Sequence, residues 1–282
     1  MKIGFVTDST SDLPGAVIEQ HELEVIPCIL VIDGKEYMDG IDITRDEFYK
    51  KLSSMPAYVP ITTAAPSIGV FGARYESLLS RGCDHILSIH AAGTLTSIID
   101  SARQAAQDFE GRITVIDSTS LTLGLGFQVM AAVEAAELGL QAALEAVEST
   151  RRRLDIYAAL STMENLKRSG RVPGVVAALG SLLSIKPLIR LKESEVKAIS
   201  AVRTSSQGNE KILDLLLQQG ALERLAILHT GAESRAREFL HTVMQKASQM
   251  VPRDILMVNV TTVIGTHVGP NGLGFAAIKA GR

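Results

Sequence analysis

The sequence has little of several features that mark common functional classes. Its 282 residues include no tryptophan, only two cysteines and 4% aromatic residues. Cys28 and Cys83 stand alone, without CxxC spacing or a matching pair of histidines, so neither a disulfide framework nor a zinc or other metal site is expected. We interpret both as buried thiols of a protein in a reducing compartment.

An excess of positive charge is also missing. The formal net charge is −3 at pH 7. Such a chain creates no field that attracts phosphate backbones, and it has no basic residues interleaved with aromatic ones. We therefore expect no nucleic acid among its partners.

Long hydrophobic runs are absent as well. The first residues, MKIGFVTDSTSDL, reach Asp8 after too few apolar positions to form the core of a signal peptide. The most apolar internal window, residues 174–185, is too short to span a bilayer and is followed by Lys186 and Pro187. These patterns predict a cytoplasmic protein without an integral membrane segment.

The familiar catalytic motifs are missing too. The chain has no GxxxxGK[ST] loop for a triphosphate, no GxSxG nucleophile elbow and no HExxH metal pair. Residues 124–127 and 272–275 both read GLGF, but neither completes GxGxxG. We therefore expect no cofactor, and a nucleotide site would need another design.

What the sequence does contain is an alternation of short β-rich runs with helical periodicity. Apolar residues make up 46% of the chain and recur on one helical face within residues 98–109 and 232–248. Residues 185–199 predict a hairpin that turns near Glu193 and Ser194. The runs expected to be strands are residues 2–7, 84–89, 112–117, 155–161, 224–230 and 254–264. This alternation predicts an α/β fold with largely parallel sheets flanked by helices.

The chain length predicts two domains, since a domain averages about 150 residues. The long helical region of residues 120–153 ends in RRRLD after a run of alanine and leucine. We place the boundary there, which gives an N-terminal α/β domain of residues 1–153 and a C-terminal α/β domain of residues 154–282. Residues 33–40, DGKEYMDG, are expected to form a turn-rich insertion.

Hydroxyl side chains are expected at two helix starts. Thr63 precedes Pro66, a natural first-turn residue, and Thr96 and Ser97 precede the apolar helical face that begins at Ile98. A helix start leaves free backbone N–H groups and a positive dipole end, which suit a small anion. Serine and threonine at such places usually serve only as caps, so neither site alone decides the function. The acidic DSTSD of residues 8–12 equally fits a capped turn.

One histidine lies in a stretch rich in glycine. Around His267 the sequence reads VIGTHVGPNGLGF, and Gly265, Gly269 and Pro270 are expected to exclude a regular helix. A histidine of this kind is more often a satisfied loop or core residue than a catalytic one. His267 therefore gains meaning only together with the hydroxyl residues.

In combination these stretches resemble the DegV family, essentially from end to end. The segments that carry the resemblance are VTDSTSDLP at 6–14, TTAAPS at 62–67, LTSIIDSA at 95–102, VIDS at 115–118, LKRSGRV at 166–172, LLSIKPLI at 182–189 and GTHVGP at 265–270. The resemblance implies a bacterial two-domain α/β protein that holds one long-chain fatty acid, such as hexadecanoate, in a tunnel between its domains. A separate fatty acid kinase then phosphorylates the carboxyl group to an acyl phosphate used in phospholipid metabolism.

The resemblance also assigns roles to residues. Thr63 and Thr96, with Ser97 beside it, match positions whose hydroxyls hold the carboxylate, and His267 matches the histidine that closes the same end. The sequence departs from the family pattern at Ala64–Ala65, where Ser-Gln is typical, and at Ser97–Ile98, where Gly-Thr is typical. These departures leave the acyl-chain preference and the head-group contacts open.

The chain is expected to present a ligand and not to be an enzyme, but two alternatives stay open. The first alternative is a hydrolase or acyltransferase in which His267 activates Thr96 or Ser97, although the sequence reveals no acidic residue to orient the ring. The second is a scaffold whose pocket binds an adventitious molecule.

Arg171 and Arg203 belong to basic stretches that ordinarily stay solvated, but the resemblance makes them candidates for docking the kinase.

Overall fold

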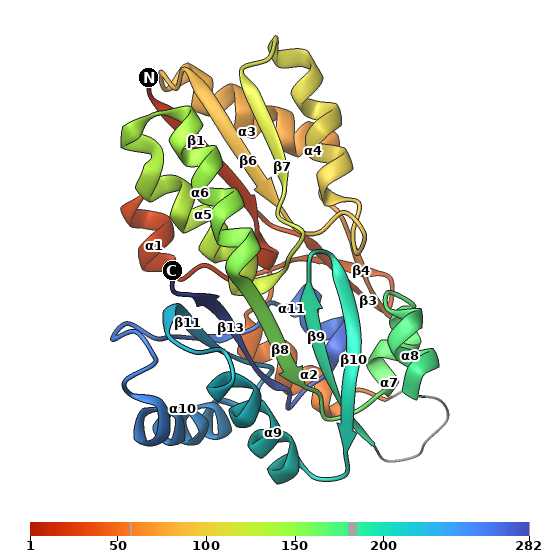
Figure 1. The fold of residues 1–282 in the computed structure, drawn as a ribbon. Coiled ribbons are helices and arrows are strands. Elements are labelled where there is room, and N and C mark those ends of the chain that lie inside the picture. The colour runs from red at the N-terminus through yellow and green to blue at the C-terminus, as the bar shows by residue number, and fades with distance from the viewer. Residues whose placement is uncertain (57, 180–184, 282) are drawn as a thin grey trace.

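A computed structural model describes residues 1–56, 58–179 and 185–281. Its first layer is a four-stranded parallel sheet in the order β2-β1-β6-β7 (Figure 1). These strands are β1 (Ile3–Asp8), β2 (Glu24–Ile26), β6 (His85–His90) and β7 (Ile113–Asp117). The burial of β1 and β6 along almost their whole length is typical of a parallel sheet covered on both faces. The expected α/β class and the three longer strands are confirmed.

Helices cover both faces of this sheet (Figure 1). Helices α3 (Ile68–Ser80) and α4 (Ile98–Ala106) lie on one face, and α5 (Thr122–Ala135) and α6 (Leu140–Arg153) lie on the other. The short helix α1 (Gly15–Gln20) lies on the side of α5. Single turns of 3₁₀ helix, η1 (Ser9–Ser11), η2 (Gln107–Phe109) and η3 (Ala136–Leu138), connect these elements. The helix expected within residues 98–109 corresponds to α4 and η2.

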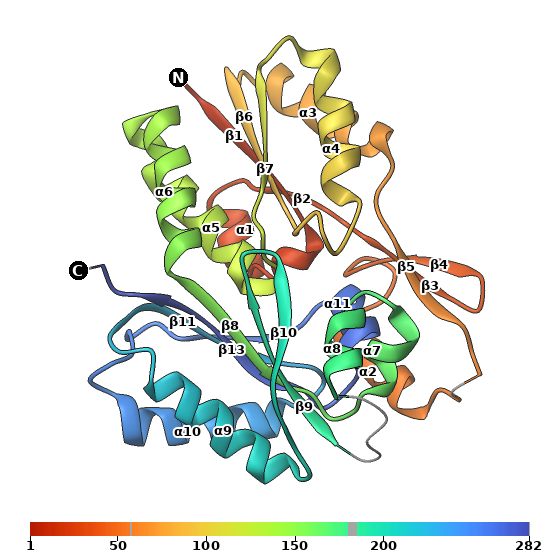
Figure 2. The same ribbon diagram turned by 45° about the vertical axis from the view of Figure 1, so that its right-hand side comes forward.

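A small antiparallel sheet projects beside the first layer (Figure 2). It has the order β4-β3-β5, built from β3 (Ile29–Ile32), β4 (Lys35–Met38) and β5 (Ile61–Ala64), and α2 (Arg45–Ser54) packs near it. The expectation of a turn-rich insertion at residues 33–40 is therefore wrong for β4. Asp33 and Gly34 both have positive φ, 51° and 76°, which is the two-residue turn that a DG pair favours in a hairpin.

The second large sheet has six strands in the order β10-β9-β8-β13-β11-β12. Its strands are β8 (Leu154–Ala159), β9 (Lys186–Lys192), β10 (Glu195–Val202), β11 (Leu222–His229), β12 (Leu256–Asn259) and β13 (Leu273–Lys279). Neighbours from β10 to β11 are antiparallel, and β12 joins β11 in parallel. The expected hairpin at Glu193 and Ser194 is confirmed. The expectation of largely parallel sheets is corrected for this sheet, because β13 inserts between β8 and β11 against the direction of both.

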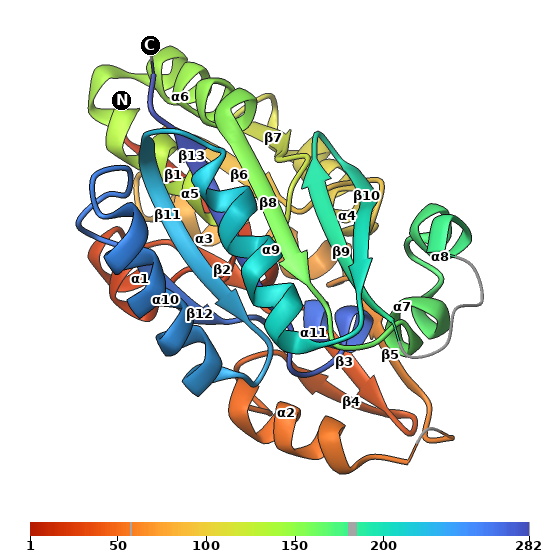
Figure 3. The same ribbon diagram turned by 60° about the horizontal axis from the view of Figure 1, so that its bottom comes forward.

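Helices α9 (Ser205–Leu217) and α10 (Glu233–Ala247) cover one face of the six-stranded sheet (Figure 3). Side chains alternate along β8: Tyr157 and Ala159 join the core under these helices, whereas Ile156 joins the core that includes the four-stranded sheet. The face that bears Ile156 is thus turned towards the first layer. Three short helices, α7 (Glu164–Ser169), α8 (Pro173–Leu179) and α11 (Thr262–Val268), lie at its edge.

The course of the chain relates these layers to the predicted domains. Helix α6 ends at Arg153 and β8 begins at Leu154, so the four-stranded sheet comes from the first predicted range and the six-stranded sheet from the second. The small sheet and α2, although part of the first range, contact α11 of the second. The division into domains 1–153 and 154–282 stays a prediction.

Candidate functional site

A cavity of about 520 Å³ lies where the two large sheets, the small sheet and α11 meet. This volume is within the range of about 300–1,000 Å³ that is usual for small-molecule sites. Most of its wall is aliphatic. The aliphatic residues include Ile156, Ala158, Leu160, Ile189, Leu191, Val196, Val260, Val263, Ile264, Val268 and Leu273. Such a wall can cover an apolar chain from water.

The cavity wall contains one direct contact between polar side chains from distant parts of the chain. Thr63 lies in β5 and His267 lies in the last turn of α11, and the Oγ1 of Thr63 is 3.0 Å from the Nε2 of His267. Burial lowers the pKa of His267 to about 4, and the positive charge of Arg171 contributes in the same direction. The imidazole is therefore neutral at pH 7.

The other ring nitrogen of His267 lacks a partner. Its Nδ1 is buried and makes no hydrogen bond with any described residue. A buried polar atom without a partner is costly, and in native proteins it usually meets a water molecule, an ion or a ligand. The ring thus retains hydrogen-bonding capacity that the protein itself does not use.

The expectation that glycine and proline exclude a helix around His267 is wrong. Helix α11 begins after Thr261, whose side chain accepts from the N–H of Val263 at 3.4 Å, and ends at Val268, where Gly269 follows with φ 80°. Gly265 instead permits close packing, because a Cβ there would lie 2.3 Å from the Oη of Tyr49. The strand expected to run to residue 264 ends at Asn259, since the β-branched residues that follow enter the helix.

Thr63 also differs from its expected setting. The sequence predicts a loop just before a helix for Thr63, but this residue lies in β5 opposite Leu30, and α3 does not begin until Ile68. Pro66 belongs to the connection, not to the first turn of the helix. Thr63 therefore presents its hydroxyl from a strand and not from the start of α3.

Thr96 and Ser97 lie where the sequence places them. Ser97 is the N-cap residue of α4, and the Oγ1 of Thr96 accepts from the N–H of Ile98 at 3.4 Å. Both line the same cavity as Thr63 and His267. The structure thus brings these four residues to one cavity, and their role as ligand contacts stays a prediction.

Of the two arginines Arg171 and Arg203, the structure brings only the first to the cavity. Arg171 lines the cavity, whereas Arg203 lies exposed before α9 and is not part of the cavity wall. The backbone N–H of Arg203 donates to Oε1 of Gln207 at 3.1 Å, close to the N-terminus of that helix. Arg171 is therefore the one of the pair whose charge reaches the site.

A buried Ser-His-Asp arrangement is a feature that the sequence did not reveal. His90 Nδ1 is 2.9 Å from Asp8 Oδ2, and its Nε2 is 2.6 Å from Ser88 Oγ, which also lies 2.8 Å from the hydroxyl of Tyr75. Burial raises the pKa of Asp8, but the hydrogen bond and charge of His90, with the hydroxyl of Thr10, lower it overall.

This arrangement has no access to a substrate. Ser88, His90 and Asp8 are fully buried, and neither Ser88 nor His90 lines the cavity. Asp8 also accepts from the N–H of Thr10 at 3.0 Å, which confirms the capped turn expected there. The signal that could have found the cluster is its position, because Asp8 and His90 end neighbouring parallel strands, whose carboxyl ends meet at one edge of the sheet.

Two kinds of feature are missing from the part of the chain that the structure describes. Over residues 1–56, 58–179 and 185–281, no cluster of histidine, cysteine, aspartate and glutamate has the arrangement of a metal site. Within the same ranges, no helix has the length and apolar character needed to cross a bilayer.

Comparisons with known proteins agree on one family. The family model described as "Uncharacterised protein, DegV family" matches residues 2–280. A DegV domain-containing protein of Deinococcus radiodurans is 33% identical over 285 residues, which is 98% of each chain.

Solved structures give the same result. A DegV family protein of Thermus thermophilus, described as fatty acid-binding, is 34% identical and superposes with a TM-score of 0.89 over 99% of this chain and all of its own. DegV of Bacillus subtilis, also described as a fatty acid-binding protein, is 27% identical, with a TM-score of 0.85 over 99% of this chain and 100% of its own.

Proposed function

This chain belongs to the DegV family, and on that premise we propose that it binds one long-chain fatty acid, such as hexadecanoate, in the cavity. The observation that carries the proposal is the union of an aliphatic wall with a polar end, at which Thr63 meets His267. The carboxylate lies at that end and the acyl chain lies along the wall. The binding described for the relatives of Thermus thermophilus and Bacillus subtilis supports the same ligand class.

The aliphatic wall supplies most of the affinity. Each methylene group removed from water contributes about 0.8 kcal/mol, so several buried methylenes outweigh a single hydrogen bond. The polar end then decides the direction in which the chain enters, because a carboxylate left against aliphatic side chains would lose its hydration without compensation.

The polar end offers suitable partners for a carboxylate. The hydroxyls of Thr63, Thr96 and Ser97 can donate, and so can a neutral imidazole from one of its nitrogens. Arg171 adds a positive charge to the same wall. None of these contacts requires enclosure of both carboxylate oxygens, so one oxygen stays free for a partner.

We further propose that the bound acid is presented to a separate fatty acid kinase, which converts the carboxyl group to an acyl phosphate. The lack of a phosphate-binding loop motif supports a division of labour between two proteins. Arg203 is exposed and Arg171 lies at the site, and both are proposed to contribute to docking of the kinase. Cys28 and Cys83 are free and buried, which fits action in the reducing cytoplasm.

A hydrolase or acyltransferase is the weaker candidate. A histidine base needs a nucleophile within hydrogen-bond distance and usually a third group that orients its ring. Among the described residues, His267 has its hydrogen bond with Thr63, not with Thr96 or Ser97, and its Nδ1 has no acidic partner.

Native mass spectrometry tests the binding proposal. The purified protein, stripped of lipid and incubated with hexadecanoate, should gain the mass of one fatty acid per chain, and hexadecane at the same concentration should not replace it. An unloaded protein that hydrolyses a fatty acyl ester would contradict the proposal and support the enzyme. Addition of ATP, magnesium and a fatty acid kinase should then yield acyl phosphate only when the loaded protein is present.

A further inference from the structure

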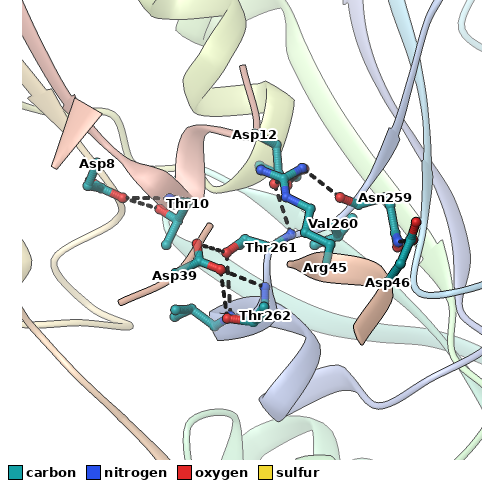
Figure 4. Close-up of polar contacts among 12 residues, drawn as sticks. Asp8, Thr10, Asp12, Asp39, Arg45, Asp46, Asn259, Val260, Thr261 and Thr262 are labelled. Carbon is teal, nitrogen blue, oxygen red and sulfur yellow. Dashed lines mark hydrogen bonds and ion pairs between the residues drawn. The ribbon is translucent and has the colours of Figure 1, made fainter. Parts of the chain in front are cut away.

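The end of α11 opposite His267 is held by a cluster of polar side chains, all buried except that of the partly exposed Arg45, which we call the α11 anchor (Figure 4). It consists of Asp12, Asp39, Arg45, Thr261 and Thr262. The three charged residues come from the turn after β1, the segment after β4 and the first turn of α2, and the two threonines begin α11. None of these five residues has a part in the proposed ligand contacts.

Asp39 contacts both threonines. One of its oxygens accepts from the hydroxyl of Thr261, and the other accepts from the N–H of Thr262 at 3.2 Å and from the hydroxyl of Thr262 at 2.7 Å. The N–H of Asp39 itself donates to the carbonyl of Cys28 at 2.9 Å, which ties this carboxylate to the segment that enters β3.

Asp12 holds the same helix start from another side. It accepts from the N–H of Thr261 at 2.9 Å and from the hydroxyl of Thr122 at 2.6 Å, and its Oδ1 lies 3.0 Å from Nη1 of Arg45. Arg45 also donates to the carbonyl of Asn259 at 2.6 Å. Thr261, the N-cap residue of α11, therefore donates hydrogen bonds to two carboxylates, those of Asp12 and Asp39.

These contacts matter for the position of α11 because the helix is short. It has seven residues, and an isolated helix of that length is unstable in water. The N–H groups at its start have no partner within the helix, and acidic acceptors there also match the helix dipole. The orientation of α11 is thus set by its surroundings: the α11 anchor at its start, the packing of Gly265 against Tyr49 and, beside His267, the side-chain amide of Asn165, which donates to the carbonyl of Thr266 at 3.1 Å.

A small movement of α11 would alter the polar end of the cavity. The helix rises about 1.5 Å per residue, so a slip by one residue would carry His267 out of hydrogen-bond distance of Thr63. The contact at 3.0 Å therefore depends on where the first residue of the helix is fixed.

We propose that Asp39 and Asp12 are positioning residues for the head-group site, because they fix the start of α11 and thereby hold the His267 ring against Thr63. The consequence for ligand affinity rests on the proposed function, but the effect on the ring does not. Asp39 and Asp12 do not line the cavity, and they act through Thr261, Thr262 and the helix that follows.

The test compares variants of Asp39 by NMR titration of the His267 ring in the ligand-free protein. Asp39→Ala removes all three acceptor contacts and should move the pKa of His267 from about 4 towards the ordinary 6.5, as the ring gains access to water. Asp39→Asn keeps an acceptor for Thr262 and should leave that pKa nearly unchanged. Asp155→Ala is the matched control, because Asp155 is fully buried and paired with Arg190 but lies away from α11.

A double-mutant cycle extends the test to binding. Asp39→Ala should weaken hexadecanoate binding by about 5- to 30-fold in the native background and by less than about twofold in a His267→Ala background, because interacting residues are not additive. If Asp39→Ala does not fold, Thr262→Val removes only one donor to Asp39 and should shift the His267 pKa in the same direction by less.

The outcomes separate the two proposals. An unchanged His267 pKa in folded Asp39→Ala and Thr262→Val proteins, or an equal change in Asp155→Ala, would overturn the positioning role. Additive losses of affinity in the cycle would overturn it as well. If no variant and not even the native protein binds hexadecanoate, the proposed function fails, while the NMR titration still decides whether Asp39 positions the ring.

Discussion

Four threonines of the cavity wall form two groups that differ in what their hydroxyls contact. Thr10 and Thr122 donate to the fully buried carboxylates Asp8 and Asp12 behind the wall, so their hydroxyls are already used. Thr63 and Thr96, in contrast, meet His267 and a backbone N–H, and each retains hydrogen-bonding capacity towards the cavity.

This difference shows how one cavity made of similar residue types can have an apolar body and a polar end. A threonine whose hydroxyl is donated to a buried carboxylate behaves towards a ligand much like valine. The buried aspartates thus reduce the polarity of the cavity body at Thr10 and Thr122, whereas the end at Thr63 and His267 keeps groups that can compensate a carboxylate.

The largest expected effect comes from filling the apolar body. Ala158 lines the cavity from β8, and Ala158→Phe should displace about four methylene groups of the ligand, worth about 3 kcal/mol, and weaken hexadecanoate binding about 100-fold or more. The matched control is Ala201→Phe on the edge strand β10, away from the cavity. Competition with a fluorescent fatty acid measures the affinity of both variants. Equal affinity of the two variants would mean that the acyl chain lies elsewhere.

A smaller loss is expected when the polar end is broken. Thr63→Val keeps the shape of the side chain but removes its hydroxyl, so hexadecanoate should bind about 10- to 150-fold more weakly, as for the loss of one hydrogen bond to a charged group. Hexadecan-1-ol should bind almost equally to both proteins. Titration calorimetry with both ligands gives the comparison, and parallel losses for acid and alcohol would show that Thr63 does not contact the carboxylate.

The pH dependence of His267 provides a third test. Without ligand its pKa is about 4, below the ordinary 6.5, because burial disfavours the charged ring. The unfolded chain therefore binds the proton more strongly, and the contribution of His267 to stability is lost as pH falls from about 6.5 through about 4.

A ligand carboxylate beside the ring should raise the pKa of His267, so the loss of stability at acid pH should be smaller in the complex. NMR titration with and without hexadecanoate measures the shift, with the exposed His241 as reference, and a pKa that does not rise would contradict the contact.

The smallest effect on binding is expected in the body of the cavity. Thr10→Val removes a hydroxyl that Asp8 already uses, so hexadecanoate affinity should change by less than about threefold. The free energy of unfolding should nevertheless fall by about 1–3 kcal/mol, because a buried carboxylate loses a partner. Urea denaturation beside the binding assay separates the two effects, and a loss of affinity as large as that of Thr63→Val would remove the distinction between the groups.

Much of the fold could be predicted from the sequence, because local patterns determine it. The strands β1, β6, β7, β8 and β11 follow from short apolar runs, and α10 follows from its amphipathic periodicity. The errors lie where tertiary contacts override local signals. Gly272 and Gly274, before and within β13, resemble a loop, and the β-branched residues of α11 resemble a strand until Asp12 and Asp39 are seen to hold its start.

The site was less accessible to local reasoning. Expected helix starts and a glycine-rich stretch point to Thr63, Thr96 and His267 one by one, but only the family resemblance joins them in one site, because residues 204 positions apart cannot be paired from spacing alone. Asp39 gave no signal, because a single aspartate after a short hairpin is ordinary in sequence. Its importance emerges only from its three contacts with Thr261 and Thr262.

A crystal structure of the protein with hexadecanoate would reveal the direction in which the acyl chain lies in the cavity. The account predicts a carboxylate oxygen within about 3.2 Å of the Oγ1 of Thr63 or of a ring nitrogen of His267, with the acyl chain against Ile156 and Val263. A carboxylate beside Thr10 and Thr122, or a cavity that takes up no hexadecanoate, would contradict it.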